Sequence, residues 1–181
     1  MLVISLLALY FLLYYGLKGF IGLDNNQLDQ QNKPIDPNQV QQMVQEDKYA
    51  NLSVEEMRKL PEIKSGLPLF TVEELSQYTG TNPKLYVAIK SVIFDVSANP
   101  VYQHNGGYHM FTGKDSSVAL ARMDHKDEFF DRENLHWSKV LTKEELKVMM
   151  DWADFFEKRY GIVGYLKEDI EMLSENGKKD L

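Results

Sequence analysis

The residues with the greatest capacity for chemistry lie between positions 101 and 117, in the sequence VYQHNGGYHMFTGKDSS. This stretch places Tyr102, His104, Tyr108 and His109 around a Gly-Gly pair. Phenol and imidazole groups can ligate metals or exchange protons. Glycine lets a bulky group approach the backbone closely. The stretch is therefore the candidate site, and ligand binding is the chemistry that it favours.

Composition narrows the chemistry further. The chain has 181 residues and 0 cysteines, which excludes disulfides, thiolate metal sites, iron–sulfur clusters and cysteine nucleophiles. Its 27 acidic and 20 basic residues give a net charge of −7, so nucleic acid is an unfavourable partner. The sequence contains no nucleophile–base pair or metal-hydrolase motif, and we do not expect an enzyme. The 4 histidines and 10 tyrosines are the candidate ligands.

The elements before the candidate site are predicted to be a helix and a β-hairpin. Thr71 and Glu74 have capping-box spacing, which predicts a short helix. Two apolar, β-branched runs at 85–89 and 92–96 follow, separated by the dipeptide 90–91. A gap of two residues is typical of a hairpin.

The elements after the site are predicted to be helices. The segment Asp115-Ser116-Ser117 is typical of an N-cap, for a helix through 118–123. Thr142 and Glu145 form a second capping box. The apolar residues after it recur at helical spacing, at Leu146, Met149, Met150, Ala153 and Phe156. The whole order predicts an α+β domain with a short mixed sheet and helices.

Residues 1–23 are predicted to be a transmembrane anchor. The run LVISLLALYFLLYY is uncharged and apolar, and the segment is long enough to span if Lys18 lies at the interface. A cleaved signal peptide is the alternative, but the segment has no basic region before the apolar run and no small-x-small cleavage site. Lys18 follows the apolar run, which by the positive-inside rule leaves the bulk of the chain in the cytosol.

The rest of the chain divides by composition. Residues 24–66 begin with a stretch rich in Gln, Asn and Asp, typical of a flexible tether, and the Ser53–Glu56 spacing predicts a short helix within it. The domain is predicted to span 67–168, with a polar C-terminal tail at 169–181.

Three ordered segments carry a family resemblance. They are LPLFTVEELSQYTG, LYVAIKSVIFDVS and the pattern Tyr-x-x-x-Gly-x-Tyr-x-x-Phe-x-Gly-x-Asp-x-Ser that begins at Tyr102. Together they resemble the membrane-associated progesterone receptor family, the branch of the cytochrome b5-like fold that includes the fungal damage-response haem protein. The resemblance covers about 67–166 and implies a cytochrome b5-like haem/steroid-binding domain behind a single N-terminal span and a variable tether.

The resemblance also implies roles for individual residues. Tyr108 is expected to be the axial ligand of a haem b, with its phenolate on ferric iron. Tyr102 matches a tyrosine that lines the same pocket. Arg159 and Tyr160 match the family's Lys-Tyr pair beside the haem, with Arg in place of Lys. Asp115 matches the aspartate that opens the helix after the haem loop.

His104 is the competing ligand. The tetrapeptide His104-Asn105-Gly106-Gly107 is similar to the His-Pro-Gly-Gly signature of cytochrome b5. However, Asp115 follows His104 too soon for that loop, and the second histidine is missing, since His125 lies in an acidic segment. The spacing around Tyr108 fits the progesterone-receptor branch, so Tyr108 is favoured.

The function implied by the resemblance is support or regulation of cytochrome P-450 monooxygenases in sterol metabolism, from a single-pass position in the endoplasmic reticulum membrane. A sterol ligand and a haem-mediated homodimer are further expectations. Two alternatives stay open: a steroid- or lipid-binding adaptor without essential haem, and an electron-transfer protein of the cytochrome b5 type that uses His104.

Overall fold

The computed structural model describes residues 48–172. The predicted anchor at 1–23, the tether up to residue 47 and the last nine residues lie outside this part. Within 48–172, no helix has both the length and the apolar character needed to cross a membrane. The chain divides into two compact units, Met1–Ser53 and Val54–Leu181, and the fold described below is that of the second.

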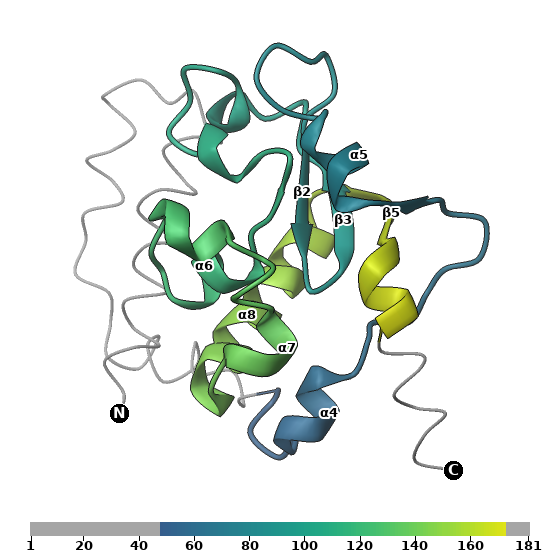
Figure 1. Cartoon of the computed structure of the whole chain (residues 1–181), viewed down its shortest axis with the longest axis vertical. Coiled ribbons are helices and arrows are strands. Elements are labelled where there is room, and N and C mark those ends of the chain that lie inside the picture. Colours follow the sequence, from purple (N-terminus) through teal and green to yellow (C-terminus); the bar gives the residue numbers. More distant parts are fainter. Residues whose placement is uncertain (1–47, 173–181) are drawn as a thin grey trace, which may run out of the picture. The chain divides into compact units, whose positions relative to one another are not determined.

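A mixed sheet forms the centre of this unit, in the order β1-β5-β3-β2-β4 (Figure 1). The neighbours β2/β3 and β3/β5 are antiparallel, whereas β1/β5 and β2/β4 are parallel. Both edge strands have only two residues. This confirms the predicted α+β class with a short mixed sheet. The strands are β1 (Leu69–Phe70), β2 (Tyr86–Ile89), β3 (Val92–Asp95), β4 (Lys114–Asp115) and β5 (Gly161–Leu166).

The predicted hairpin joins β2 to β3. Ile89 lies opposite Val92, and the two turn residues both have positive φ, 49° at Lys90 and 68° at Ser91. Two consecutive left-handed residues match the twist of the flanking strands, as in a type I′ turn. The turn brings Ser91 into the interior, where its side chain is fully buried.

The helices that the capping boxes predicted are present. Thr71 and Glu74 make both bonds of the box at α5, and Thr142 and Glu145 do so at α8. Residues 167–172 are helical as well. The α-helices are α4 (Val54–Arg58), α5 (Val72–Ser76), α6 (Ser117–Ala121), α7 (Trp137–Val140) and α8 (Lys143–Glu157), and the 3-10 turns are η1 (Pro100–Tyr102), η2 (His109–Phe111) and η3 (Asp127–Phe130).

The start of α6 differs in detail from the prediction. Ser116 occupies the N-cap position and makes no side-chain capping bond. Asp115 instead belongs to β4, where it pairs with Ala88, and its Oδ1 accepts the N–H of Ser117 at 3.0 Å. The aspartate therefore closes a turn one residue before the cap, because strand pairing holds its backbone in the sheet.

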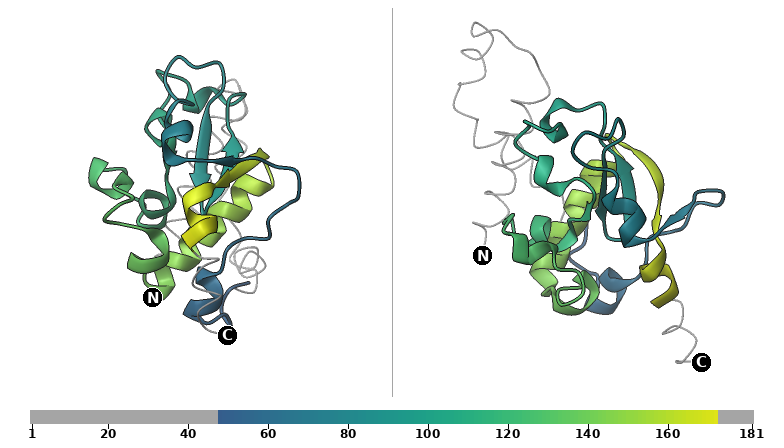
Figure 2. Two further views of the ribbon diagram at one scale, coloured as in Figure 1. Left: turned by 45° about the vertical axis from the view of Figure 1, so that its right-hand side comes forward. Right: turned by 45° about the horizontal axis from the view of Figure 1, so that its top comes forward.

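The sheet has a different core on each face. Tyr86, Ala88 and Ile93 pack on the α5 side, in a cluster with Leu75. Phe94 points the other way and meets Phe156 of α8, with 5.5 Å between the ring centroids. Successive strand residues face opposite sides of a sheet, so α5 and α8 cover opposite faces. Figure 2 gives two further views of this arrangement.

Helix α4 is part of the packed unit, although it lies within the predicted tether. Met57 is fully buried, and the Nη2 of Arg58 donates to the carbonyl oxygen of Leu141 at 3.1 Å. α4 packs against α8.

Candidate functional site

The loop that carries Tyr108 is closed by backbone contacts. The N–H of Tyr108 donates to the carbonyl oxygen of Val101 at 2.9 Å, and the N–H of Gly106 donates to that of Gln103 at 2.7 Å. A Cβ on Gly106 would lie 2.2 Å from the carbonyl oxygen of Val101, whereas a Cβ on Gly107 would meet nothing within 4 Å. Gly106 is therefore needed to close the loop, and Gly107 borders open space.

Tyrosines from distant parts of the sequence meet beside this loop. Tyr102 lies 6.0 Å from Tyr108 and 6.0 Å from Tyr160, between ring centroids. The contacts continue from Tyr108 to Phe111 at 5.9 Å and from Phe111 to Phe130 at 5.9 Å. We refer to Tyr160, Tyr102, Tyr108, Phe111 and Phe130 as the aromatic row. The structure thus brings together three of the predicted site residues.

The members of the row differ in burial. Tyr102 is 5% exposed, and its pKa is raised well above the usual value of 10, first by burial and then by its neighbours Tyr160 and Tyr108. The ring of Tyr102 also packs on Phe156 of α8 at 6.3 Å. Tyr108 is only half-buried. Tyr102 is therefore held as a neutral phenol in the interior, and Tyr108 lies nearer the surface.

Asn99 is a site residue that the sequence analysis missed. Its Nδ2 donates to the hydroxyl oxygen of Tyr160 at 2.8 Å, and its Oδ1 accepts the N–H of Val101 at 3.2 Å. One side chain thus links the start of the tyrosine loop to the end of α8. The sequence does signal a turn at this position, because an Asn-Pro dipeptide favours the start of a turn. It does not signal the contact of Asn99 with Tyr160, because the two residues are far apart in the chain.

No ring contact joins Arg159, His104 or His109 to the aromatic row among the contacts of the described residues. The guanidinium of exposed Arg159 stacks on Phe155, with its Cζ 3.7 Å from the ring centroid. His104 and His109 are both exposed, and the Nδ1 of His109 lies 2.8 Å from the carbonyl oxygen of Gly106. In the part of the chain that the structure describes, no three His, Asp or Glu side chains gather as a metal site.

The residues of the aromatic row fit a haem. A porphyrin needs apolar contacts for its faces, a donor for its iron and cations for its propionates. Aromatic rings suit the first requirement, and the phenol of Tyr108 has the chemistry for the second. The Nζ of Lys114 lies 4.4 Å from the ring centroid of Phe130, which places a cation at one end of the row.

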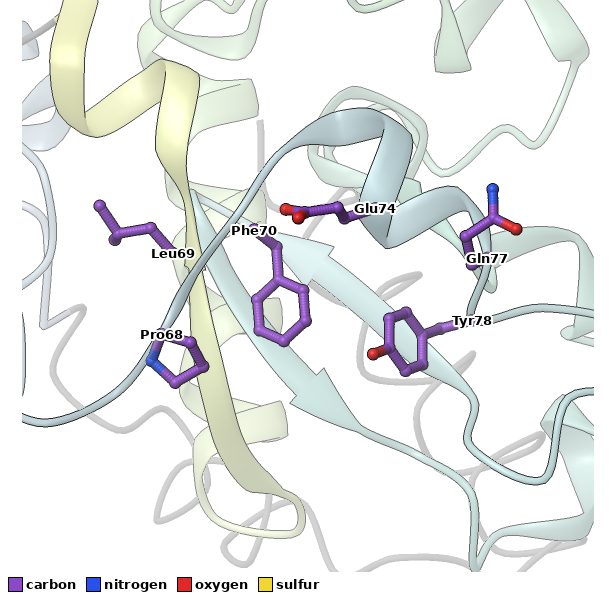
Figure 3. A pocket seen from close by; sticks show the side chains of 6 residues that line it. All are labelled: Pro68, Leu69, Phe70, Glu74, Gln77 and Tyr78. Atoms are coloured by element: carbon purple, nitrogen blue, oxygen red, sulfur yellow. The ribbon is translucent and has the colours of Figure 1, made fainter.

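A separate cavity of about 310 Å³ lies on the α5 face of the sheet (Figure 3). Aromatic rings pack against one another along its wall. Phe70 meets Tyr78 edge-on and Tyr78 stacks on Tyr86, with 5.8 Å and 4.1 Å between the ring centroids. Since Tyr86 faces α5 and Phe94 faces α8, the sheet separates this cavity from the aromatic row. The cavity is lined by Pro68, Leu69, Phe70, Glu74, Gln77 and Tyr78.

Comparison with known proteins gives a consistent set of relatives. Residues 71–167 match the family described as "Cytochrome b5-like Heme/Steroid binding domain". The chain is 41% identical over 98 residues to "Probable steroid-binding protein 3" of Arabidopsis thaliana, covering 52% of this chain and 94% of that protein. It is 35% identical over 102 residues to "Cytochrome P450 regulator dap1" of Schizosaccharomyces pombe, covering 54% of this chain and 61% of the relative.

Other relatives are longer, and similar structures have been solved. The match to "Membrane steroid-binding protein 1" of Arabidopsis thaliana is 40% identical over 101 residues and covers 54% of this chain but 44% of that protein. A solved Arabidopsis thaliana structure described as having a cytochrome b5 like fold aligns with a TM-score of 0.50 at 36% identity. It covers 60% of this chain and 98% of that chain.

Proposed function

Since this chain belongs to the cytochrome b5-like heme/steroid binding domain family, in its membrane-associated progesterone receptor branch, we propose that it is a haem-binding accessory protein in which Tyr108 ligates the iron. The observation that carries the proposal is the aromatic row, in which half-buried Tyr108 stands between Tyr102 and Phe111. The row offers a phenol donor inside an apolar, aromatic surface.

Residues in and beside the aromatic row have different proposed roles. When bound, ferric haem b would supply a redox-active iron that an anionic oxygen ligand stabilises in the ferric state. Tyr108 would hold the iron through its phenolate oxygen. Tyr102 keeps its proton, because burial raises its pKa, and packs beside Tyr108. Asn99 holds the hydroxyl of Tyr160 at one end of the aromatic row.

Arg159 is proposed to pair with a haem propionate. Its exposed side chain is long enough to leave the ring of Phe155, and a guanidinium binds a carboxylate through two parallel hydrogen bonds. The family has Lys at this position, which offers a point charge and not a planar fork. We expect Arg159→Ala to weaken haem binding and leave the ferric spectrum unchanged.

Absorption spectra of the purified protein test the ligand. The wild type should take up haem b and give a mainly high-spin ferric spectrum, which Tyr108→Phe should abolish. Tyr78→Phe removes a tyrosine hydroxyl on the other face of the sheet and is the matched control. A low-spin spectrum that is lost in His104→Ala would contradict the proposal and favour electron transfer of the cytochrome b5 type. Failure of the wild type to bind haem would contradict both.

We propose further that the protein supports cytochrome P-450 monooxygenases of sterol metabolism from the endoplasmic reticulum membrane, anchored by residues 1–23. Support comes from a relative named as a cytochrome P450 regulator and from others named as membrane steroid-binding proteins. In microsomes, the full chain should resist carbonate extraction, and a variant without residues 1–23 should be extracted. Protease should digest the domain in intact microsomes if it faces the cytosol.

The partner proposal is tested in a reconstituted system. The full chain should raise turnover or lifetime of a sterol-oxidising P-450 supplied with its reductase, and Tyr108→Phe should lose this effect. An equal effect of both proteins would show that haem on Tyr108 is not required. Sedimentation of the domain with and without haem would show whether a dimer forms only when haem is bound.

A steroid-binding adaptor is the second candidate, and the cavity on the α5 face favours it. Its volume of about 310 Å³ is at the lower end of ligand pockets. Its lining combines aromatic and proline side chains with the polar side chains of Glu74 and Gln77. Equilibrium binding of progesterone should be weakened by Phe70→Ala and unchanged by Tyr108→Phe. The reverse pattern would place the steroid on the aromatic row.

A further inference from the structure

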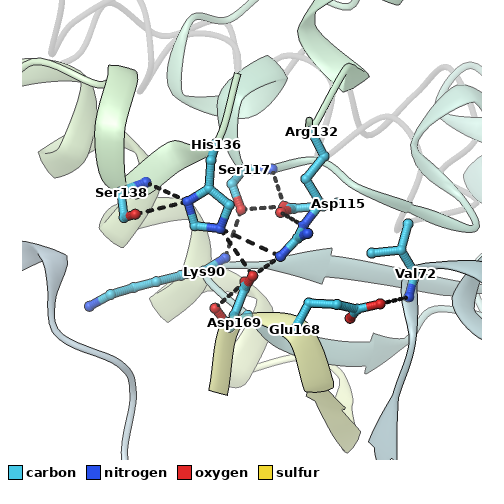
Figure 4. Close-up of polar contacts among 10 residues, drawn as sticks. Val72, Lys90, Asp115, Ser117, Arg132, His136, Ser138, Glu168 and Asp169 are labelled. Atoms are coloured by element: carbon cyan, nitrogen blue, oxygen red, sulfur yellow. Dashed lines mark hydrogen bonds and ion pairs between the residues drawn. The ribbon is translucent and has the colours of Figure 1, made fainter. Parts of the chain in front are cut away.

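A buried cluster of charged side chains lies outside the aromatic row (Figure 4). Arg132 is at its centre, with its Nη2 paired to the Oδ1 of Asp169 and its Nε 3.4 Å from the Oδ2 of Asp115. The side chains of Asp169 and Asp115 are 0% and 6% exposed, and that of Arg132 is 18% exposed. Charges this deeply buried are costly unless they are paired.

The other polar contacts of the cluster complete this pairing. Asp169 also accepts the hydroxyl of Ser91 at 2.6 Å, and its Oδ1 lies 3.0 Å from the Nε2 of His136. The Nδ1 of His136 accepts the N–H of Ser138, so the neutral ring carries its proton on Nε2 and donates it to Asp169. Burial and the neighbouring Arg132 lower the pKa of His136 to about 4, so the ring is neutral near pH 7.

Arg132 is tied directly to the end of the aromatic row. Its N–H donates to the carbonyl oxygen of Phe130 at 2.9 Å, and the ring of Phe130 packs on Phe111. Asp115, its first partner, follows Lys114, whose ammonium lies over the same Phe130 ring. The backbone of Arg132 and the ring of Phe130 thus link the buried charge cluster to the Phe111 end of the aromatic row.

We propose that Arg132 is a positioning residue of the aromatic site, which holds residues 127–132 against the row by pairing with β4 and with the helix at 167–172, called the C-terminal helix below. Asp169 lies 61 residues after Tyr108 in the chain, yet it secures this segment through Arg132. The C-terminal helix thus controls access to Phe111 and Tyr108 from the Phe130 side. The effect on a bound haem rests on the proposed function, but the position of the segment does not.

Hydrogen exchange of the apoprotein tests the positioning role. In Asp169→Asn, Arg132 loses one of its two carboxylates, and amides in 127–132 should exchange roughly tenfold faster or more. Amides in the middle of α8 exchange through global unfolding, so their exchange should change only by as much as the variant changes global stability. Arg132→Lys should also speed exchange in 127–132, because an ammonium lacks the fork that reaches both carboxylates. Its effect should be smaller, because lysine keeps the positive charge. Lys126→Ala, which removes an exposed ion pair in the same region, is the control and should change little.

Two further results distinguish local positioning of residues 127–132 from a general effect on global stability. The double variant Arg132→Gln/Asp169→Asn should be more stable than Arg132→Gln alone, because it leaves one buried carboxylate, Asp115, without its partner and not two. It should not regain the protection of residues 127–132. Equal acceleration of exchange in α8 and in 127–132, or none in 127–132, would overturn the proposal. In the haem-loaded protein, Asp169→Asn should release haem faster to apomyoglobin; if the wild type binds no haem, the proposed function fails and the exchange result still stands.

Discussion

Gly106 and Gly107 are adjacent in the chain but have different surroundings. A Cβ at position 106 would lie 2.2 Å from the carbonyl oxygen of Val101, and one at 107 would contact nothing within 4 Å. Gly106→Ala should therefore push the Tyr108 loop away from Val101 and cost about 1–3 kcal/mol of stability. Urea denaturation of the apoprotein measures this cost.

Gly107→Ala is the matched control for that experiment. It adds the same methyl group to the same loop, and it should change the free energy of unfolding by less than about 0.5 kcal/mol. Equal destabilisation by both variants would show that the close contact of Gly106 with Val101 does not determine the loop conformation.

His136 makes the stability of the protein depend on pH. Burial, followed by the charge of Arg132, lowers its pKa to about 4 from the usual 6.5. The unfolded chain therefore binds the proton more tightly, and stability is fully present above pH 6.5 and falls as the pH drops toward 4. The loss reaches up to about 3 kcal/mol by pH 4.

Unfolding in urea between pH 7.5 and pH 4.5 measures this dependence. Because carboxylates also begin to titrate near the acid end, the comparison is with His136→Gln, which keeps an amide that can donate to Asp169 but has no titrating ring. The variant should lose less stability than the wild type over this pH range. Parallel pH profiles would mean that His136 is not the source of the acid sensitivity.

At the scale of elements, the β2–β3 turn carries a conformational cost. Lys90 has a φ of 49°, a left-handed conformation in which Asn is far more common than Lys. Its N–H donates to the hydroxyl oxygen of Ser117, a bond that any residue but proline would keep. Lys90→Asn should therefore stabilise the protein by about 0.5 kcal/mol.

Thermal unfolding measures the change at position 90. Lys139→Asn is the control, because this exposed lysine lies in helix α7, where Asn has the lower helix propensity. Its melting temperature should be unchanged or lower. If Lys90→Asn lowered the melting temperature as much as Lys139→Asn, the backbone conformation at position 90 would not be the dominant effect.

Local signals explain which elements the sequence could predict. The capping boxes at 71–74 and 142–145 and the dipeptide turn at 90–91 depend on residues close in sequence, and all three are confirmed. β5 was missed because glycines weaken a strand pattern. A Cβ on Gly164 would lie 2.5 Å from the carbonyl oxygen of Pro68, so this glycine serves the close passage of the chain beside β5.

The same distinction applies to the site. Tyr102, Tyr108 and Tyr160 could be predicted because a motif with fixed spacing contains the first two and the family pattern contains the third. Asp169 could not, since an aspartate in a polar C-terminal segment is typical of solvent. Its burial depends on Ser91 and Arg132, which are distant in sequence and carry no shared pattern.

At the scale of the whole described unit, the sheet separates the two proposed binding surfaces. The aromatic row lies with α8, and the cavity beside Phe70 and Tyr78 lies with α5. A ligand on one face need not displace a ligand on the other, because the buried strands β2 and β3 stand between them. Haem and steroid binding can therefore be measured as separate properties of one domain.

Helix α4 leads to a prediction about where the folded unit begins. Met57 is fully buried and Arg58 bonds to the carbonyl oxygen of Leu141, so removing α4 uncovers part of α8. A fragment of residues 67–181 should be less stable than one of residues 54–181 by about 4 kcal/mol, the sum of one buried methionine and two hydrogen bonds, from Arg58 to Leu141 and from the N–H of Lys64 to the hydroxyl of Tyr165. Urea denaturation of both fragments measures the difference. Equal midpoints and slopes would show that α4 adds nothing and that the unit begins at residue 67, as the sequence predicted.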